Sequence, residues 1–232
     1  MLTPFVLEGR HARLEPLTEE HVPGLVEAAA EDRASYAYTW VPQGTAQAEE
    51  YVRSALADHA RGRSLPWAVR RLADGRIVGS TRYLDLEVFG ASPTQPAPPP
   101  SDGCPPSVLE IGNTWYAASA QRTGVNTDVK LQLLERAFDV WAVLRVTLKT
   151  DARNRASRTA IERLGARFEG VRRVHVLATD GTLRDTAYFS ILREEWPQVR
   201  AALRHRRSGE SAHRPISGGS RYTASPQVGP DG

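Results

Sequence analysis

Cysteine and long hydrophobic runs are scarce in this chain of 232 residues. The single cysteine, Cys104, has no second cysteine with which to form an internal disulfide bond. No run approaches the roughly 18–20 apolar residues that a membrane-spanning helix needs. Residues 1–4 show neither the charged start nor the apolar stretch of a secretory signal. These absences argue against a disulfide scaffold and a membrane partner, and we expect a cytoplasmic protein.

Lysine is also rare, because Lys130 and Lys149 are the only two and arginine supplies the rest of the positive side-chain charge. The net charge of +3 and the isoelectric point of about 9.2 are mildly basic. The chain has no motif that combines aromatic with basic residues as nucleic-acid-binding folds do. We therefore expect no nucleic-acid partner, whereas an anionic cofactor would suit a local basic patch.

Strand-like and helical segments alternate unevenly along the chain, with hairpins at both ends. This pattern, with 41% hydrophobic residues, predicts one α/β (α+β) domain with a mixed sheet over residues 1–206. Prolines lack the amide hydrogen of a β-ladder, so segment 91–107 is expected to be an insertion loop without a strand. It is either a tolerated surface insertion or a lid or partner contact. Residues 207–232 are rich in Ser, Gly, Pro and Arg, which predicts a disordered basic tail.

The stretch 110–165 organises the chain. A strand over 109–116 leads through a polar loop into a helix over 127–141, for which Asn126 is the expected N-cap. Four residues of that helix recur at spacings of three and four and are expected to face the core: Leu131, Leu134, Phe138 and Trp141. A second strand over 144–150 then leads to a short helix that Asn154 opens and Gly165 closes.

The outer parts of the chain predict further elements. Thr18 is the expected cap of a helix that ends near residue 30. The other expected elements are a helix over 47–61, a hairpin of 67–71 with 76–84, and a closing helix over 194–204.

The dipeptide Asp180-Gly181 predicts a two-residue hairpin turn. Two cross-strand pairs follow from that register: His175 with Thr186 and Arg173 with Tyr188. Asp185 falls on the apolar face and is interpreted as a structural residue paired with Arg172.

The loop before the central helix is where we expect the chemistry to begin. Backbone N–H groups at a helix N-terminus are unpaired and carry partial positive charge, so they suit a phosphate ligand. Gly124 lets the backbone turn tightly and approach such a ligand closely.

Residues Gln121-Arg122-Thr123-Gly124-Val125-Asn126 resemble the pyrophosphate-binding loop of GNAT N-acetyltransferases, with Asn126 as a departure where the family has Gly or Ala. The surrounding order is more specific: Glu-Ile-Gly-x-x-Trp, the loop, Arg-Val-x-Leu, Asn-x-x-Ser and Leu-Gly-Ala. That order resembles the RimJ/RimL branch, which acetylates protein N-termini and related amines. The resemblance covers roughly residues 7–203 and implies a largely antiparallel sheet, flanked by helices and splayed in the middle, with acetyl-CoA in the split.

The resemblance also implies which residues hold acetyl-CoA. Residues Arg122, Thr123, Gly124, Val125, Asn126 and Thr127 would bind its pyrophosphate, mainly through backbone N–H groups. The backbone of Thr114, Trp115 and Tyr116 would pair with the pantetheine arm and supply the oxyanion donor. Asn154 would hydrogen-bond the pantetheine. The alternative interpretation is an ordinary capped helix start, and no metal is expected.

By the same resemblance, Ser157 is the general acid that protonates the leaving thiolate. Ile161 stands where many relatives have a tyrosine donor, and Lys149 stands where some have a glutamate base. Glu110 and His175 are then the candidates for the general base, the latter because imidazole titrates near neutral pH. Water remains an alternative carrier of the proton, and each side chain has a purely structural alternative role.

The sequence thus predicts direct transfer of an acetyl group from acetyl-CoA to a primary amine, either a protein N-terminus or a small molecule. A non-catalytic acyl-CoA-binding module is the alternative, because Asn126, Lys149 and Ile161 depart from the family pattern. An RNA-associated protein is a third, less supported hypothesis, and a homodimer is left open.

Overall fold

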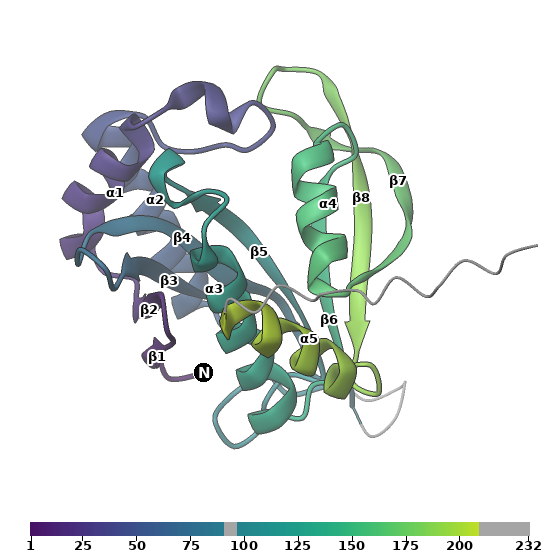
Figure 1. Ribbon diagram of the computed structural model, residues 1–232. Coiled ribbons are helices and arrows are strands. Elements are labelled where there is room, and N and C mark those ends of the chain that lie inside the picture. The colour runs from purple at the N-terminus through teal and green to yellow at the C-terminus, as the bar shows by residue number, and fades with distance from the viewer. Residues whose placement is uncertain (91–96, 209–232) are drawn as a thin grey trace, which may run out of the picture.

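One eight-stranded sheet runs through the molecule in the order β1-β2-β3-β4-β5-β6-β8-β7 (Figure 1). The computed structural model describes residues 1–90 and 97–208. The strands are β1 Leu7–Glu8, β2 Ala12–Pro16, β3 Ser64–Arg71, β4 Ile77–Glu87, β5 Val108–Tyr116, β6 Arg145–Asp151, β7 Arg167–Leu177 and β8 Leu183–Leu192. Every neighbouring pair is antiparallel except β5 and β6, which confirms the predicted mixed, mostly antiparallel sheet.

Within residues 1–90 and 97–208, five α-helices flank this sheet: α1 Val22–Ala30, α2 Gly44–Ala60, α3 Gly124–Glu135, α4 Arg155–Leu164 and α5 Trp196–Ser208. Two adjacent residues of β4 show that α2 and α3 cover opposite faces, because neighbouring side chains of a strand point to opposite sides. The Tyr83 hydroxyl donates to the Leu133 carbonyl of α3, whereas the Arg82 guanidinium lies over the ring of Tyr51 in α2.

The sheet is split where β5 meets β6. The two parallel strands pair only through Val108–Arg145, Leu109–Val146 and Glu110–Thr147, and then they diverge. The pairing of β5 with β4 shifts between Ser80 and Arg82, and Asn113 has a positive φ of 48°. Between these pairs, β5 has one residue more than β4, which is a β-bulge and bends the strand. The predicted splay is therefore present, and the bulge lies at Asn113, three residues after the last pair that β5 shares with β6.

The core agrees with the predicted helical stripe, while the start of the helix does not. Leu131, Leu134, Phe138 and Trp141 are all buried, as expected. The N-cap of α3 is Thr123, however, and its side chain accepts a bond from the Val125 N–H. The prediction of Asn126 as N-cap was wrong because several residues of this loop have cap-forming side chains.

The short helix α4 forms as predicted. The Asn154 side chain accepts a bond from the Ser157 N–H at 3.0 Å, which makes it the N-cap. Gly165 ends the helix with a φ of 101°, a left-handed conformation that glycine adopts without a steric penalty.

The β7–β8 hairpin differs from its prediction. Leu177 pairs with Leu183, so the loop has five residues rather than two. Thr186 lies opposite Arg172 and Tyr188 lies opposite Gly170, because β7 is irregular twice, between Phe168 and Gly170 and between Arg172 and Val176. The predicted pairing of Arg173 with Tyr188 was wrong. The Asp185 carboxylate accepts a bond from the Val174 backbone rather than forming the expected pair with Arg172.

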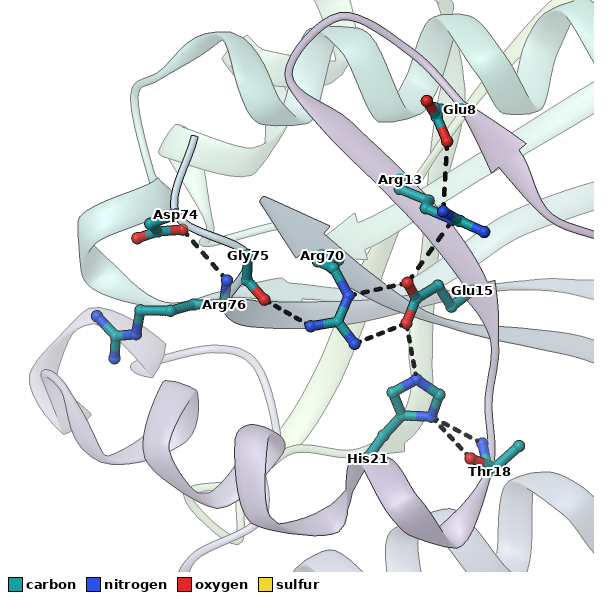
Figure 2. Close-up of polar contacts among 9 residues, drawn as sticks. All are labelled: Glu8, Arg13, Glu15, Thr18, His21, Arg70, Asp74, Gly75 and Arg76. Atoms are coloured by element: carbon teal, nitrogen blue, oxygen red, sulfur yellow. Dashed lines mark hydrogen bonds and ion pairs between the residues drawn. The ribbon is translucent and has the colours of Figure 1, made fainter. Parts of the chain in front are cut away.

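An ion-pair network joins the first strands to the start of the first helix (Figure 2). The Glu15 carboxylate accepts two bonds from Arg70, at 2.8 and 2.9 Å, and lies 3.2 Å from His21 Nε2. The Thr18 N–H donates to the other ring nitrogen of His21, which assigns the ring proton to Nε2. The bonds from Arg70, with smaller contributions from His21, lower the pKa of Glu15 to about 2 despite its partial burial.

The proline-rich segment is described from residue 97 onward, and residues 91–96 lie outside the described part. Its described residues contain no strand beyond an isolated bridge between Ser101 and Cys104. The Asp102 carboxylate accepts bonds from the Thr3 N–H and hydroxyl. This loop is therefore joined to the N-terminal residues.

The last helix is longer than predicted. It continues to Ser208, so residues 207 and 208, assigned from sequence to the tail, belong to α5. The Arg207 guanidinium lies 3.5 Å from the Asp128 carboxylate of α3, which gives the extension a contact. The remainder of the predicted tail, residues 209–232, lies outside the described residues. None of the described helices is long and apolar enough to cross a membrane.

Candidate active site

The split in the sheet brings three elements together. Beyond Glu110, the edge of β5 that faces β6 has no strand partner, from Ile111 to Tyr116. The N-terminus of α3 follows the end of β5, and that of α4 follows the end of β6 (Figure 1). Unpaired strand groups and helix N-termini offer hydrogen-bond donors to an extended, anionic ligand.

The first turn of α3 presents backbone donors to solvent. Arg122, Thr123 and Gly124 are exposed, and Arg122 has a positive φ of 57°. The Thr123 hydroxyl donates to the Ala120 carbonyl at 2.7 Å and caps the helix. The remaining predicted loop residues, Val125, Asn126 and Thr127, lie inside the helix, with Val125 fully buried. The cap occupies one of the first amides and leaves others for an anion.

Gly124 lies against a side chain from the N-terminal part of the chain, which the sequence does not show. A Cβ atom at this residue would lie 2.8 Å from the ring of His11, in the β1–β2 turn. The backbone of that turn is fixed in turn by α3, because the buried Asp128 carboxylate accepts bonds from the His11 and Ala12 N–H groups at 2.7 and 3.0 Å. The helix N-terminus is thus packed tightly on the β1–β2 turn.

The predicted pantetheine strand, Thr114, Trp115 and Tyr116, is bonded by side chains at its last residue. The Tyr116 carbonyl accepts bonds from the Tyr36 hydroxyl at 3.1 Å and the Gln121 side chain at 3.0 Å. The side chains of Trp115 and Tyr116 are buried, so they help to fix the backbone.

A pocket of about 410 Å³ lies beside the N-terminus of α4. Its lining residues are Ser35, Ala37, Tyr38, Arg153, Asn154, Arg155 and Ala156. Since Asn154 Oδ1 caps the helix, its amide nitrogen is left to donate to a ligand. Ser157 is half-buried and lies outside this lining, so the structure does not bring the predicted acid to the pocket wall.

Arg153 joins the two sides of this pocket. Its guanidinium bonds Asp151 at the end of β6 and Asp180 in the β7–β8 loop, each at 2.8 Å. The same group lies 5.2 Å from the ring centroid of Tyr38, on the segment after α1. These contacts raise the pKa of Arg153, through the bond to Asp151 first and that to Asp180 second.

Glu110 stands at the point where the sheet splits. Its carboxylate lies 2.5 Å from the Lys149 ammonium, which also bonds Asp85 at 2.9 Å. Glu110 is only 6% exposed, and this burial raises its pKa to about 7, against the opposing effect of Lys149. Burial lowers the pKa of Lys149, but the bonds to Glu110 and Asp85 outweigh it and the pKa is raised overall. A carboxyl group that titrates near neutrality can act as a general base.

His175 belongs to the same polar group of side chains. Its ring lies 3.0 Å from the Thr186 hydroxyl and 3.3 Å from that of Tyr188. The Lys149 ammonium lies 5.4 Å from the Tyr188 ring centroid, which connects His175 to Glu110 through two side chains. Desolvation, followed by the nearby Arg172 and Lys149 charges, lowers the pKa of His175. The structure therefore brings both candidate bases to one face, with Glu110 nearer the split.

Sequence reasoning missed three residues of this region. Gly112 leaves space for Glu110, because a Cβ there would collide with the carboxylate of Glu110. Asn113 forms the bulge, and Lys130 of α3 donates to the Thr114 hydroxyl at 2.8 Å. Burial lowers the pKa of Lys130 to about 7. The rarity of lysine was a signal in the sequence that could have pointed to Lys130. The sequence has no comparable signal for Asn113, because a register shift leaves no local pattern.

The comparisons with known proteins agree with this geometry. Residues 11–167 match the family described as the acetyltransferase (GNAT) domain. A GCN5-related N-acetyltransferase from Brucella melitensis is 29% identical, with 87% of this chain and 85% of that one covered and a TM-score of 0.72. No curated protein sequence gives a significant match.

Two more distant structures show the fold alone. RimJ from Mycobacterium smegmatis, in complex with CoA-disulfide, is 21% identical over 89% of this chain and 95% of its own, with a TM-score of 0.68. The microcin C7 self-immunity acetyltransferase MccE, bound to acetyl-CoA and AMP, is 16% identical over 78% and 92%, with a TM-score of 0.63. The family match over residues 11–167 confirms the predicted GNAT resemblance, and the RimJ/RimL branch stays a prediction.

Proposed function

The chain belongs to the GNAT acetyltransferase family, since the matched residues 11–167 make up more than half of it, and from this premise we propose that it transfers the acetyl group of acetyl-CoA directly to a primary amine. The observation that carries the proposal is the split sheet with a buried carboxyl group, Glu110, at its origin and two helix N-termini along it. An acetyl donor supplies an activated thioester there, and the protein supplies binding and proton transfer.

Three groups of this chain hold the donor. The backbone amides of residues 122–127, in the loop before α3 and in its first turn, face its pyrophosphate, apart from the Val125 amide that the Thr123 cap occupies. The unpaired edge of β5 from residue 111 to 116 bonds its extended arm as a further strand would. The Asn154 amide donates to the same arm. A backbone N–H of 114–116 stabilises the oxyanion that develops on the thioester.

Two side chains move the protons. The Glu110 carboxylate removes a proton from the amine, which must be neutral to attack. The Ser157 hydroxyl gives a proton to the departing thiolate, which requires this side chain to turn toward the split. The Lys149 ammonium opposes the rise that burial causes in the pKa of Glu110, and we assign it this electrostatic role in place of that of a base.

The test measures thiol release from acetyl-CoA with a panel of amines that contains peptide N-termini and small molecules. We expect amine-dependent release, and a Glu110→Gln variant that binds CoA normally but reacts slowly. Tight acetyl-CoA binding with no release for any amine would instead support the acyl-CoA-binding alternative. Nothing in the described residues favours an RNA-associated function, and a homodimer and a cytoplasmic location stay predictions.

No metal enters this proposal. Among residues 1–90 and 97–208, no group of three or more His, Cys, Asp or Glu side chains lies close enough to hold a metal ion. The chemistry described above rests on the protein's own carboxylate, hydroxyl and backbone donors.

A further inference from the structure

Arg82 is a buried cation for which the described residues provide no polar partner. It is 4% exposed, and its Nε has no hydrogen bond. The other buried Asp, Glu and Lys side chains in the described part of the chain are each bonded: Glu110 to Lys149, Lys130 to Thr114, Asp128 to His11 N–H and Asp151 to Arg153. Arg82 has only the ring of Tyr51, 4.5 Å from its Cζ.

A guanidinium stays charged inside a protein, so burial without an anion is unfavourable. A cation–π contact offsets part of this cost and leaves the N–H groups unsatisfied. Buried polar groups are nearly always hydrogen-bonded, so an unsatisfied one in a candidate active site needs a partner, which a water or a ligand can supply.

Two neighbouring groups are unsatisfied in the same way. The Tyr51 hydroxyl and the Trp115 Nε1 are buried without a hydrogen-bond partner. The Tyr51 ring lies 6.5 Å from the Trp115 ring, centroid to centroid. In the β4–β5 register, Trp115 pairs with Ser80 and Gly112 with Arg82, so Trp115 and Arg82 lie on one face of the sheet. The three groups together offer mainly donors, which suits an oxyanion.

Glu110 lies on the same face, two residues from Gly112. Directly opposed and diagonal side chains on neighbouring strands are roughly 5–8 Å apart. Gly112, which has no side chain, is the residue between Arg82 and Glu110 in this register. One small acceptor could therefore place an anionic group at Arg82 and an amine at Glu110, with only a few covalent bonds between the two groups.

We propose that Arg82, with Tyr51 and Trp115, binds a carboxylate on the acceptor, whose amine lies at Glu110. This inference rests on the proposed acetyl transfer and narrows its acceptors to amines with a nearby carboxylate. A carboxylate fits because it accepts two parallel bonds from a guanidinium. A doubly charged phosphate would be repelled more strongly by Glu110 and Asp85.

The experiment compares matched acceptors on the wild type and on Arg82→Met. One pair is the peptides Asp-Ala-Ala-amide and Asn-Ala-Ala-amide, and the second is β-alanine and β-alaninamide. We expect the wild type to have a KM roughly 10–100-fold lower for the carboxylate member than for the amide member of one pair or of both. The pair that shows the difference tells whether the acceptor is a peptide or a small molecule. In Arg82→Met the ratio should fall to about one, with an unchanged or higher melting temperature.

A calorimetric titration with succinate, in the presence of CoA, tests the site without turnover. Succinate should bind the wild type and the control Arg136→Met, whose guanidinium lies over Phe5 and Trp141, but not Arg82→Met. Equal use of both members of each pair, together with no succinate binding, would overturn the carboxylate site and leave amine acetylation standing. Tighter binding of inorganic phosphate than of succinate, or a melting temperature lowered by several degrees in Arg82→Met, would also overturn it.

Discussion

At the scale of single residues, the protonation of Glu110 sets the expected pH dependence. Burial raises its pKa to about 7, so the base is ionised above pH 7 and protonated below it. The rate constant kcat/KM should therefore fall as the pH drops through 7. Glu110→Gln should lower kcat by ~10²–10⁴-fold, the usual contribution of general acid–base catalysis.

Protonation of the acceptor amine also lowers kcat/KM at acidic pH, so the assignment of the pH dependence to Glu110 needs a control. Acceptors whose amines differ in pKa shift the part of the profile that belongs to the substrate and leave the part that belongs to Glu110. A wild-type profile that follows only the amine, and is retained in Glu110→Gln, would assign the proton to water.

Asn154 and Ser157 make a second contrast at this scale. If Ser157 protonates the thiolate, Ser157→Ala should lower kcat, toward the lower end of ~10²–10⁴-fold because a thiolate is a fair leaving group. Asn154→Ala removes an anchor and a helix cap, so it should raise the KM for acetyl-CoA. Steady-state kinetics with one active amine distinguishes the two. Full turnover in Ser157→Ala, with chemistry rate-limiting, would reduce Ser157 to part of a helix start.

At the scale of elements, the N-terminus of α3 and the β1–β2 turn act together. Gly124→Ala brings a Cβ against the His11 ring and should tilt the helix start, which weakens CoA binding on the order of tenfold through the displaced amides. The double variant His11→Ala with Gly124→Ala removes the collision and should recover affinity, as measured by calorimetry.

His11→Ala alone is the matched control and should bind CoA nearly as the wild type does. Unchanged affinity in a folded Gly124→Ala protein would show that the pyrophosphate binds elsewhere. An equal loss of CoA affinity in Gly124→Ala and in the double variant would show that the added methyl group meets the ligand rather than His11.

The elements also show what the sequence could predict. The stripe from Leu131 to Trp141, the Asn154 cap and the Gly165 stop depend on local spacing, and the structure has all of them. The register of β7 with β8 depends on irregularities in β7, near Gly170 and Val174, that no local pattern encodes.

The candidate site shows the same limit. Glu110 could be named from its motif, but its pairing with Lys149 joins strands on opposite sides of the split, so it arises only from the tertiary fold. The unsatisfied Arg82 depends on its burial beneath Tyr51, which the sequence of β4 does not reveal.

At the scale of the whole molecule, the Glu15 network should contribute to acid stability. Its folded-state pKa of about 2 lies below the ordinary 4.5, so its contribution is complete above pH 4.5 and is lost as the pH falls toward 2 (Figure 2). Glu15→Gln should lower the melting temperature at pH 7 by roughly 3–8 °C, if the charged bonds contribute about 1.5–2 kcal/mol.

Thermal unfolding of both proteins across pH checks this expectation. The difference between them should shrink below pH 4.5, where the Glu15 carboxylate of the unfolded wild type begins to protonate while that of the folded protein stays ionised until the pH nears 2. Arg53→Gln, on the exposed face of α2 where Arg53 pairs with Glu50, is a control that should change little. A constant difference down to pH 2 would show that Glu15 contributes by packing and not by charge.

The split sheet has a final consequence, for the isotope exchange of backbone amides. The two halves of the sheet share only three residue pairs, so about half of the amides between residues 111 and 116 point toward β6 and have no strand acceptor. Along residues 111–116, the amides that point toward β6 should therefore exchange quickly with deuterium, and those that pair with β4 should exchange slowly. The amides of residues 108–110 should all exchange slowly. Acetyl-CoA, by occupying the free edge, should slow the fast set, which residue-resolved NMR can follow. Uniform slow exchange in the free protein would mean that the two strands close on each other when no ligand separates them.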